Sequence, residues 1–207
     1  MKALIIVDVQ YDFCPGGALA IKEGDKAVKV INQIRDLFDT IVFTQDWHPP
    51  DHKSFASTYN KKVNEVIDLN GVPQILWPDH CVQNTKGAMF LSSLIVKKDD
   101  FIVRKGMDPE VDSYSAFFDN MKKNKTTLDD YLHTRGINDI FVTGLASDYC
   151  VKFTVSDGLE LGYRVTVITD GIRGVDLNPG DVDKAIFEME QKGACFLTSK
   201  ALLKGEN

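Results

Sequence analysis

The sequence predicts a three-layer α/β/α fold built on a central, mostly parallel sheet of six strands. Short runs rich in β-branched residues alternate with helical patterns along most of the chain, and this alternation implies right-handed crossovers between parallel strands. Several of the runs are almost continuously apolar, as expected for strands that helices cover on both faces.

The predicted strands are short, apolar and separated by polar or glycine-containing segments. Their β-branched and aromatic residues favour strand over helix, and their lengths are those of ordinary strands. They span residues 2–7, 40–45, 101–105, 139–144, 164–169 and 194–198.

The predicted helices lie between these strands. In the first, apolar residues recur three and four positions apart, which indicates one buried face. The other three end in glycine, a common signal at a helix C-terminus. The four segments are 24–38, 127–136, 147–162 and 180–193.

Residues 46–100 interrupt the alternation. The segment is rich in Pro, Asn, Asp and His and only weakly periodic. Long irregular segments inside a compact domain usually carry function. We therefore expect a single domain over residues 1–207, with a metal- and substrate-binding insertion at about 46–100.

The composition is that of a globular protein. The chain of 207 residues is 43% hydrophobic with a net charge of −6, and no basic cluster interleaved with aromatics suggests a nucleic-acid partner. No run approaches the roughly 18 apolar residues of a membrane helix, so no membrane partner is expected. Asp8 interrupts the N-terminal apolar run, which argues against a signal peptide, and a cytoplasmic location is expected. The sequence leaves open whether the chain forms a homo-oligomer.

The four cysteines are far apart and show no C-x-x-C pairing, so neither a zinc finger nor a redox pair is indicated. Disulfides are not expected in a reducing compartment. Cys14, in a turn, is predicted to be structural, and Cys195 is predicted to lie in the core.

Polar residues stand where the predicted strands end. Asp8 and Asp46 directly follow two of them, Lys105 ends a third, and the stretch GLASDYC leads from a fourth to Cys150. Ligands bind outside the carboxyl ends of strands in open α/β sheets. We therefore expect these side chains to meet at one rim.

Cys150 is a candidate nucleophile. Ser147 or Asp148 is predicted to cap the following helix, which places Cys150 in its first turn, where free N–H groups and the helix dipole stabilise a thiolate. A thiolate available near neutral pH is a reactive nucleophile. The alternative is a buried apolar cysteine that faces the sheet.

Asp8 and Lys105 are the candidate partners of this thiol. Asp8 would accept its proton and later donate it to a leaving amine, while Lys105 would keep positive charge nearby. The alternative is a buried ion pair without catalytic function, because a buried carboxylate needs a cationic partner.

A second constellation predicts a metal site. Asp46 and His48 lie two apart, and side chains at this spacing project to the same side of an extended chain, which Pro49 favours at His48. With His80 they give two nitrogens and one carboxylate, and the open positions that remain are typical of catalytic sites. Zn²⁺, Fe²⁺ and Mn²⁺ all suit such ligands. Solvated loop histidines are the alternative, and the sequence does not decide whether His52 joins the site.

Aromatic residues gather in the same irregular regions. A flat heteroaromatic ligand would suit a cage built from them, although they could equally cover the loops. They are Phe13, Trp47, Trp77 and Tyr114.

Taken together, these stretches resemble the isochorismatase-like cysteine hydrolases. The resemblance runs over nearly the whole chain in the order of that family, and the combination is far more specific than any one piece. The stretches are IIVDVQYDFCPGGALA, TQDWHPPDHKSFAS, WPDHCVQNT, RKGMDPEVDSYSAFFDN and VTGLASDYCVKFTVSDGLELGYRVTVITDGIRGV.

The resemblance implies a role for each candidate residue. It implies a catalytic triad of Asp8, Lys105 and Cys150, and one divalent metal ion, zinc with iron and manganese as alternatives. It implies a cis peptide between Leu145 and Ala146, with the N–H groups of Ala146 and Cys150 facing a developing oxyanion. The remaining implied residues are the metal ligands Asp46, His48 and His80 and the ring-binding residues Phe13, Trp77 and Tyr114.

The function implied is the hydrolysis of nicotinamide to nicotinate and ammonia through a thioester on Cys150, in NAD salvage. Isochorismatases proper lack the cysteine, so its presence favours amide hydrolysis. A related amidase that acts on another small amide or an N-carbamoyl compound is the first alternative. A catalytically silent module that binds a metal and a small ligand is the second.

Overall fold

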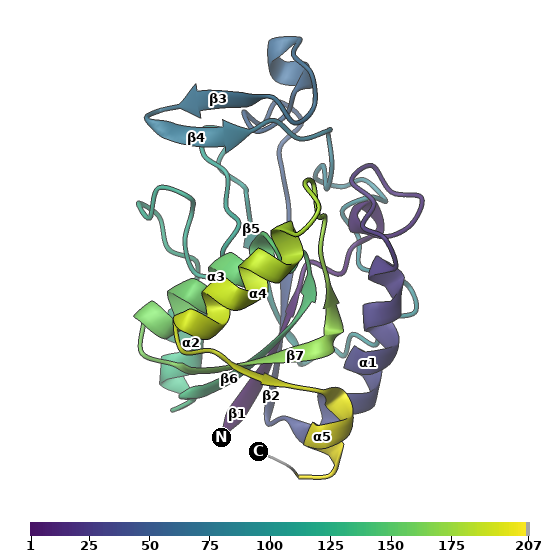
Figure 1. The fold of residues 1–207 in the computed structure, drawn as a ribbon, viewed down its shortest axis with the longest axis vertical. Coiled ribbons are helices and arrows are strands. Elements are labelled where there is room, and N and C mark those ends of the chain that lie inside the picture. Colours follow the sequence, from purple (N-terminus) through teal and green to yellow (C-terminus); the bar gives the residue numbers. More distant parts are fainter. Residues whose placement is uncertain (206–207) are drawn as a thin grey trace.

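The computed structural model describes residues 1–205, whose main sheet has six strands in the order β5-β2-β1-β6-β7-β8. Every neighbouring pair is parallel. The fold class predicted from the alternating pattern is therefore confirmed (Figure 1). The strands are β1 (Lys2–Val7), β2 (Thr40–Asp46), β5 (Phe101–Lys105), β6 (Asp139–Leu145), β7 (Arg164–Arg173) and β8 (Cys195–Leu197).

Helices cover both faces of this sheet. Helices α2, α3 and α4 lie over one face, and α1 and α5 lie over the other (Figure 1). The helices are α1 (Ala27–Ile34), α2 (Leu128–Thr134), α3 (Cys150–Glu160), α4 (Asp181–Gln191) and α5 (Ser199–Leu203).

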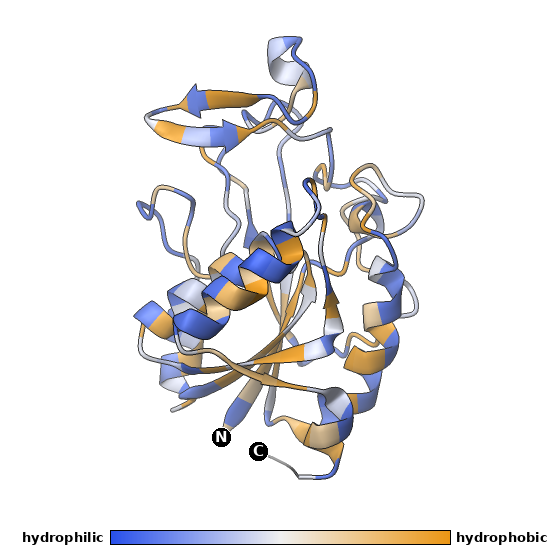
Figure 2. Ribbon diagram, in the orientation of Figure 1, coloured by the Kyte–Doolittle hydropathy of each residue, from blue (hydrophilic) through white to orange (hydrophobic). Residues whose placement is uncertain are grey.

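The core has one apolar layer on each side of the sheet. In β1, Ile5 and Val7 belong to the layer under α3, whereas Leu4 and Ile6 belong to the layer under α1. All four are fully buried. A central strand with both faces covered needs apolar residues at every position, which explains the continuous runs (Figure 2).

The predicted start of α3 is wrong. The helix begins at Cys150, with Tyr149 at the N-cap position and no capping side chain. The carboxylate of Asp148 instead accepts the N–H groups of Val175 and Asp176, and the hydroxyl of Ser147 has no partner within residues 1–205. Cys150 is nevertheless in the first turn, as predicted.

Other boundaries differ less. Strand β7 continues to Arg173, four residues beyond its predicted end at Thr169, because its last residues pair with the end of β6 after an irregularity between Val142 and Gly144. The segment 24–38 is helical, but short 3₁₀ turns at 24–26 and 35–37 flank α1.

The insertion contains a hairpin that the sequence pattern did not reveal. Strands β3 (Val66–Leu69) and β4 (Val72–Ile75) pair antiparallel and lie beyond the carboxyl ends of the sheet strands (Figure 1). Their side chains are mostly exposed or half-buried, so hydrophobic alternation is weak. The single-domain organisation with a binding insertion stays a prediction.

The cysteines are all free within the described residues. Cys14 is buried, and burial, with a further contribution from Asp25, raises the pKa of its thiol to about 12. Cys195 is exposed, so its predicted place in the core is wrong; β8 is an edge strand. No helix within residues 1–205 has the length and apolar character needed to cross a membrane.

Candidate active site

The strand-end side chains converge on the ammonium group of Lys105. Its Nζ lies 2.8 Å from Asp8 Oδ2, 3.1 Å from Asp46 Oδ1 and 3.5 Å from Cys150 Sγ. It also donates to the Ser113 carbonyl at 2.9 Å. All of these residues are buried, so this buried cation is surrounded by acceptors from several elements.

The pKa of Lys105 reflects these neighbours. Burial acts to lower it, but Asp46 and Asp8 outweigh burial and raise the pKa well above its ordinary value. Lys105 is therefore a permanent positive charge beside the Cys150 sulfur.

Cys150 differs from the predicted resting thiolate. Burial raises the pKa of its thiol well above the ordinary value; Lys105 opposes this, and Asp8 and Asp46 add to it. Cys150 is therefore a neutral thiol at neutral pH, and the expectation of a thiolate at rest is corrected. The first turn of a helix lowers the pKa of a thiol, but here burial and two nearby carboxylates raise it by more. The thiol therefore needs a base to take its proton.

The Asp8 carboxylate is held by hydrogen bonds at one of its two oxygens. The Thr44 hydroxyl donates to Asp8 Oδ1 at 2.5 Å and accepts the Asp8 N–H at 3.1 Å. Within residues 1–205, Asp8 Oδ2 accepts no well-aligned hydrogen bond, although Lys105 lies close to it. The negative charge of Asp8 also raises the pKa of the Cys150 thiol. One oxygen is thus fixed while the other remains available for a proton.

The backbone before Cys150 follows the predicted geometry. The peptide bond between Leu145 and Ala146 is cis, as the resemblance implied. Gly144 precedes it with φ +109°, and a Cβ there would lie 2.1 Å from the Val7 carbonyl oxygen, so only glycine fits. Within residues 1–205, the N–H groups of Ala146 and Cys150 donate to no backbone or side-chain acceptor. Two free donors therefore lie next to the sulfur.

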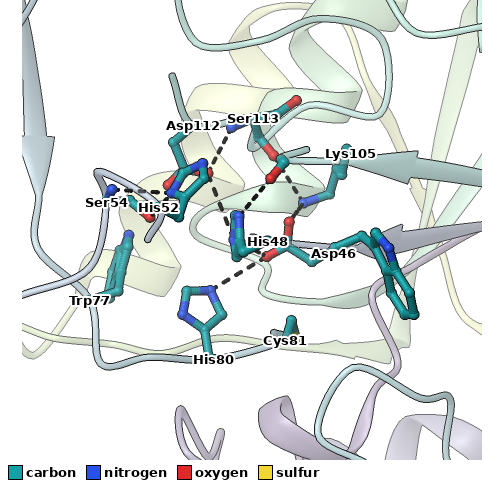
Figure 3. A network of polar contacts seen from close by, with 12 residues as sticks. Asp46, His48, His52, Ser54, Trp77, His80, Cys81, Lys105, Asp112 and Ser113 are labelled. Carbon is teal, nitrogen blue, oxygen red and sulfur yellow. Dashed lines mark hydrogen bonds and ion pairs between the residues drawn. The ribbon is translucent and has the colours of Figure 1, made fainter. Parts of the chain in front are cut away.

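Asp46, His48 and His80 form a compact group (Figure 3), and Asp46 and His80 line the same cavity as Cys150. Asp46 Oδ2 lies 3.0 Å from His48 Nε2 and 3.4 Å from His80 Nε2. One potential ligand atom from each residue falls within 4.8 Å of the others. The structure thus brings together the three predicted metal ligands.

Hydrogen bonds on the far side of both rings orient them for a cation. His48 Nδ1 lies 2.9 Å from the Gly106 carbonyl and His80 Nδ1 lies 2.8 Å from the Pro78 carbonyl. Carbonyls only accept, so both Nδ1 atoms carry a proton, and both Nε2 atoms face Asp46, where a bound cation would take their lone pairs. His48 Nε2 is buried without a hydrogen-bond partner in the described residues. This donor set fits a divalent metal with open coordination positions.

Charge in this group also suits a cation. Burial acts to raise the pKa of Asp46, but His48 and Lys105 outweigh it and hold that pKa well below its ordinary value. Asp46 is therefore an anion at any ordinary pH. Gly106 leaves room for the ring, because a Cβ there would lie 2.5 Å from His48 Cε1.

His52 lies on the other side of His48, with ring centroids 4.2 Å apart (Figure 3). Its Nδ1 accepts the Ser54 N–H at 3.1 Å and contacts the Ser54 hydroxyl at 2.7 Å. Burial, assisted by His48, lowers the pKa of His52 to about 4, so the ring is neutral. His48, His52 and Asp112 form a second close group of potential ligands.

A cavity of about 30 Å³ opens in front of the sulfur. Two predicted residues lie elsewhere: Leu145 packs in the core under α1, and Trp47 lies beneath the Arg104 guanidinium. A groove of about 750 Å³ at the opposite end of the sheet contains no candidate site residue. The smaller cavity, in front of Cys150, is lined by Phe13, Leu19, Asp46, Trp77, His80, Asp112, Tyr114, Ala146, Tyr149, Cys150 and Val175.

Residues 2–201 match the family model for the isochorismatase domain. The chain belongs to the isochorismatase family. The predicted family is therefore confirmed over nearly the whole length of the chain.

Named relatives narrow the comparison within the isochorismatase family. A nicotinamidase of Escherichia coli strain K12 is 50% identical over 201 residues, which cover 95% of this chain and 94% of the relative. A nicotinamidase/pyrazinamidase structure from Acinetobacter baumanii is 41% identical with a TM-score of 0.94, covering 97% of each chain. A pyrazinamidase structure from Pyrococcus horikoshii, in complex with zinc, is 34% identical with a TM-score of 0.79 and covers 95% of this chain and 98% of its own.

Some residues of this isochorismatase-family site were not predicted. Gln10 clamps Asp46, because its Oε1 accepts the Asp46 N–H and its Nε2 donates to the Asp46 carbonyl, both at 2.8 Å. Gln10 and Thr44 each lie two positions from a predicted site residue, and that spacing was a usable signal. Asp112 shared this signal, because it lies two positions before Tyr114, whereas Tyr149 did not.

Proposed function

We propose that this protein hydrolyses nicotinamide to nicotinate and ammonia, with Cys150 as nucleophile, Asp8 as base and Lys105 as the fixed positive charge. The observation that carries the proposal is that Lys105 contacts both Asp8 and Cys150, and that Cys150 lines an aromatic-walled cavity. A thiol, a carboxylate and two free backbone N–H groups are the parts that acyl transfer from an amide requires.

The reaction proceeds in two halves. Asp8 takes the proton of the Cys150 thiol while the sulfur attacks the amide carbon, and Lys105 stabilises the negative charge that develops on sulfur. The N–H groups of Ala146 and Cys150 donate to the oxyanion of the tetrahedral intermediate. Asp8 returns the proton to the leaving nitrogen, so ammonia departs and a thioester remains.

In the second half, water hydrolyses the thioester and Asp8 again transfers the proton. Asp8 takes a proton from the attacking water, the bond between carbon and sulfur breaks, and the proton returns to sulfur. The products are nicotinate and the free thiol. We place this activity in the cytoplasm and in NAD salvage, and the oligomeric state stays open.

The cavity supports a ring-bearing substrate. Phe13, Trp77 and Tyr114 contribute aromatic walls, and Ala146 and Cys150 lie at the reacting end. A flat pyridine ring buries both faces against such walls. The amide is thereby directed to the sulfur.

We infer that Asp46, His48 and His80 hold one divalent cation, with zinc as first choice and iron or manganese as alternatives. When bound, the cation supplies a Lewis acid beside the cavity. The orientation of both Nε2 lone pairs supports this inference, as does the zinc in the P. horikoshii relative.

Replacement of His80 with alanine tests the metal site. We expect zinc affinity to fall more than about tenfold, because the loss of even a residue behind a ligand costs 10–100-fold. Elemental analysis and a zinc titration with a competing chelator measure this. The control is His133→Ala, which removes the exposed histidine of α2. Equal zinc affinity in His80→Ala and wild type would refute the ligand assignment.

An ammonia-release assay tests the proposed substrate. We expect kcat/KM for nicotinamide to exceed that for butyramide and for an N-carbamoyl amino acid by at least about 100-fold, because only the ring fills the aromatic walls. If kcat/KM for butyramide or for the N-carbamoyl amino acid equals or exceeds that for nicotinamide, the proposed substrate is wrong.

A further inference from the structure

Gln74 is the buried polar residue of the otherwise solvent-facing β3–β4 hairpin. It is 3% exposed, although its neighbours Pro73 and Ile75 are exposed and half-buried. Its side chain points away from solvent and toward the cavity walls, where Nε2 lies 3.2 Å from the Tyr114 hydroxyl and 3.4 Å from Asp112 Oδ2. A buried carboxamide in an exposed hairpin calls for a physical reason.

The orientation of this amide is determined by its neighbours. Nε2 also lies 2.7 Å from the Ile75 carbonyl. Both the carbonyl and the Asp112 carboxylate only accept hydrogen bonds, so the NH₂ group, and not the oxygen, must face them. The two N–H bonds of Gln74 are therefore shared among three acceptors: the Ile75 carbonyl, the Tyr114 hydroxyl and the Asp112 carboxylate.

Tyr114 receives a second donor from the same insertion. Trp77 Nε1 donates to the Tyr114 hydroxyl at 3.0 Å. Burial, with Asp112 adding to it, raises the pKa of Tyr114 well above its ordinary value, so the acceptor is a neutral phenol. Gln74 and Trp77 thus both donate to the Tyr114 hydroxyl oxygen. This shared acceptor fixes the positions of the Tyr114 and Trp77 rings relative to each other.

These contacts connect two walls of the cavity. Trp77 and Tyr114 form its aromatic side, and Asp112 lies on the side of His48, 4.0 Å from Nε2. The cavity of about 30 Å³ is narrow, with room for roughly two water molecules, so the spacing of these walls decides how well a flat ring fits. The distance between the walls depends on the hydrogen bonds that position Tyr114 and Trp77.

We propose that Gln74 is a positioning residue that sets the spacing of the aromatic walls and so the selectivity for a flat six-membered ring. It acts through the Tyr114 phenol and does not touch the substrate. The proposal deepens the proposed function and rests on it for its kinetic consequences. The placement of Trp77 by the Gln74–Tyr114 contact is independent of any reaction.

A double-mutant cycle tests the kinetic part. Gln74→Met keeps the length of the side chain and removes both donors. We expect KM for nicotinamide to rise about tenfold with kcat changed less than about twofold, and the preference for nicotinamide over butyramide to fall by a similar factor. In a Tyr114→Phe background the same change should raise KM less than about twofold, because the shared phenol oxygen is gone.

The control for this cycle is Gln191→Met, a change at an exposed glutamine at the end of α4. An equal rise in KM in both backgrounds, or no rise in the wild-type background, would overturn the proposal. If Gln74→Met does not fold, Gln74→Glu replaces it, since it has the same shape and exchanges the donors for acceptors beside Asp112.

A spectroscopic measurement separates this proposal from the proposed function. The chain has two tryptophans, so labelling with 5-fluorotryptophan gives two ¹⁹F resonances, which Trp47→Phe assigns. We expect Gln74→Met to shift the Trp77 resonance and to leave that of Trp47 in place. An unmoved Trp77 resonance overturns the positioning role even if nicotinamide is hydrolysed. A shifted one supports it even if nicotinamide is not the substrate.

Discussion

Replacement of Cys150 with alanine is expected to reduce ammonia release from nicotinamide by about 10⁵-fold, the scale seen when a hydrolase loses its nucleophile. The Cys150 sulfur lies 3.5 Å from the Lys105 ammonium group, and the N–H groups of Ala146 and Cys150 have no acceptor within the described residues. Without the sulfur, binding and oxyanion stabilisation remain but no thioester can form. Steady-state ammonia assays at saturating nicotinamide measure the loss.

Cys195→Ala is the matched control, because that cysteine is exposed on an edge strand and should retain full activity. Zinc content and thermal unfolding of Cys150→Ala should match wild type, since the change removes one buried atom from a residue outside the metal ligands. Turnover in Cys150→Ala within tenfold of wild type would refute the nucleophile assignment.

Replacement of Asp8 with asparagine is expected to lower kcat/KM about 10³-fold at neutral pH, within the range for loss of a general base. The size of the effect follows from the thiol, since burial raises the pKa of Cys150 well above its ordinary value of 9.0 despite the opposing charge of Lys105. At neutral pH almost no thiolate forms unless Asp8 removes the proton.

The pH profile gives this prediction a distinct signature. Burial raises the pKa of Asp8 above 3.8, with Lys105 opposing and Asp46 adding to the rise. Wild-type kcat/KM should therefore fall as pH drops through a value above 3.8, where Asp8 is protonated. In Asp8→Asn this acid limb should vanish, and the residual rate should climb with pH as the thiolate forms. The control is Asp183→Asn on the exposed face of α4. An unchanged acid limb in Asp8→Asn would show that another group is the base.

The sheet was predictable because each strand is buried on both faces. Ile5 and Ile6 point to opposite layers, so the chain shows the continuous apolar run that separates a parallel strand from its surroundings. The strand ends then located Asp8, Asp46 and Lys105. The β3–β4 hairpin was not predicted, because its side chains are largely exposed and show little hydrophobic alternation. Gln74 connects it to the rest of the protein through contacts with Asp112 and Tyr114.

The protonation of Cys150 could not be predicted from the sequence. The first helical turn favours a thiolate, but the pKa also depends on burial and on Asp8 and Asp46, which come from distant parts of the chain. Likewise, Tyr149 lines the cavity as the N-cap residue of α3, which is two positions after Ser147 and one after Asp148, the two caps that the sequence predicted. The positions of residues in the sequence predicted which side chains meet. They did not predict how the charges and the burial of those side chains together set the pKa of Cys150.

The central claim is that Cys150 forms a covalent acyl intermediate in the nicotinamide reaction. Acid quenching during the first turnovers, followed by mass spectrometry of the Cys150 peptide, tests it most directly. We expect a nicotinoyl group on Cys150 that appears before steady state and disappears when nicotinamide is exhausted. Formation of nicotinate and ammonia at the wild-type rate with Cys150 unmodified at every time point would contradict the account.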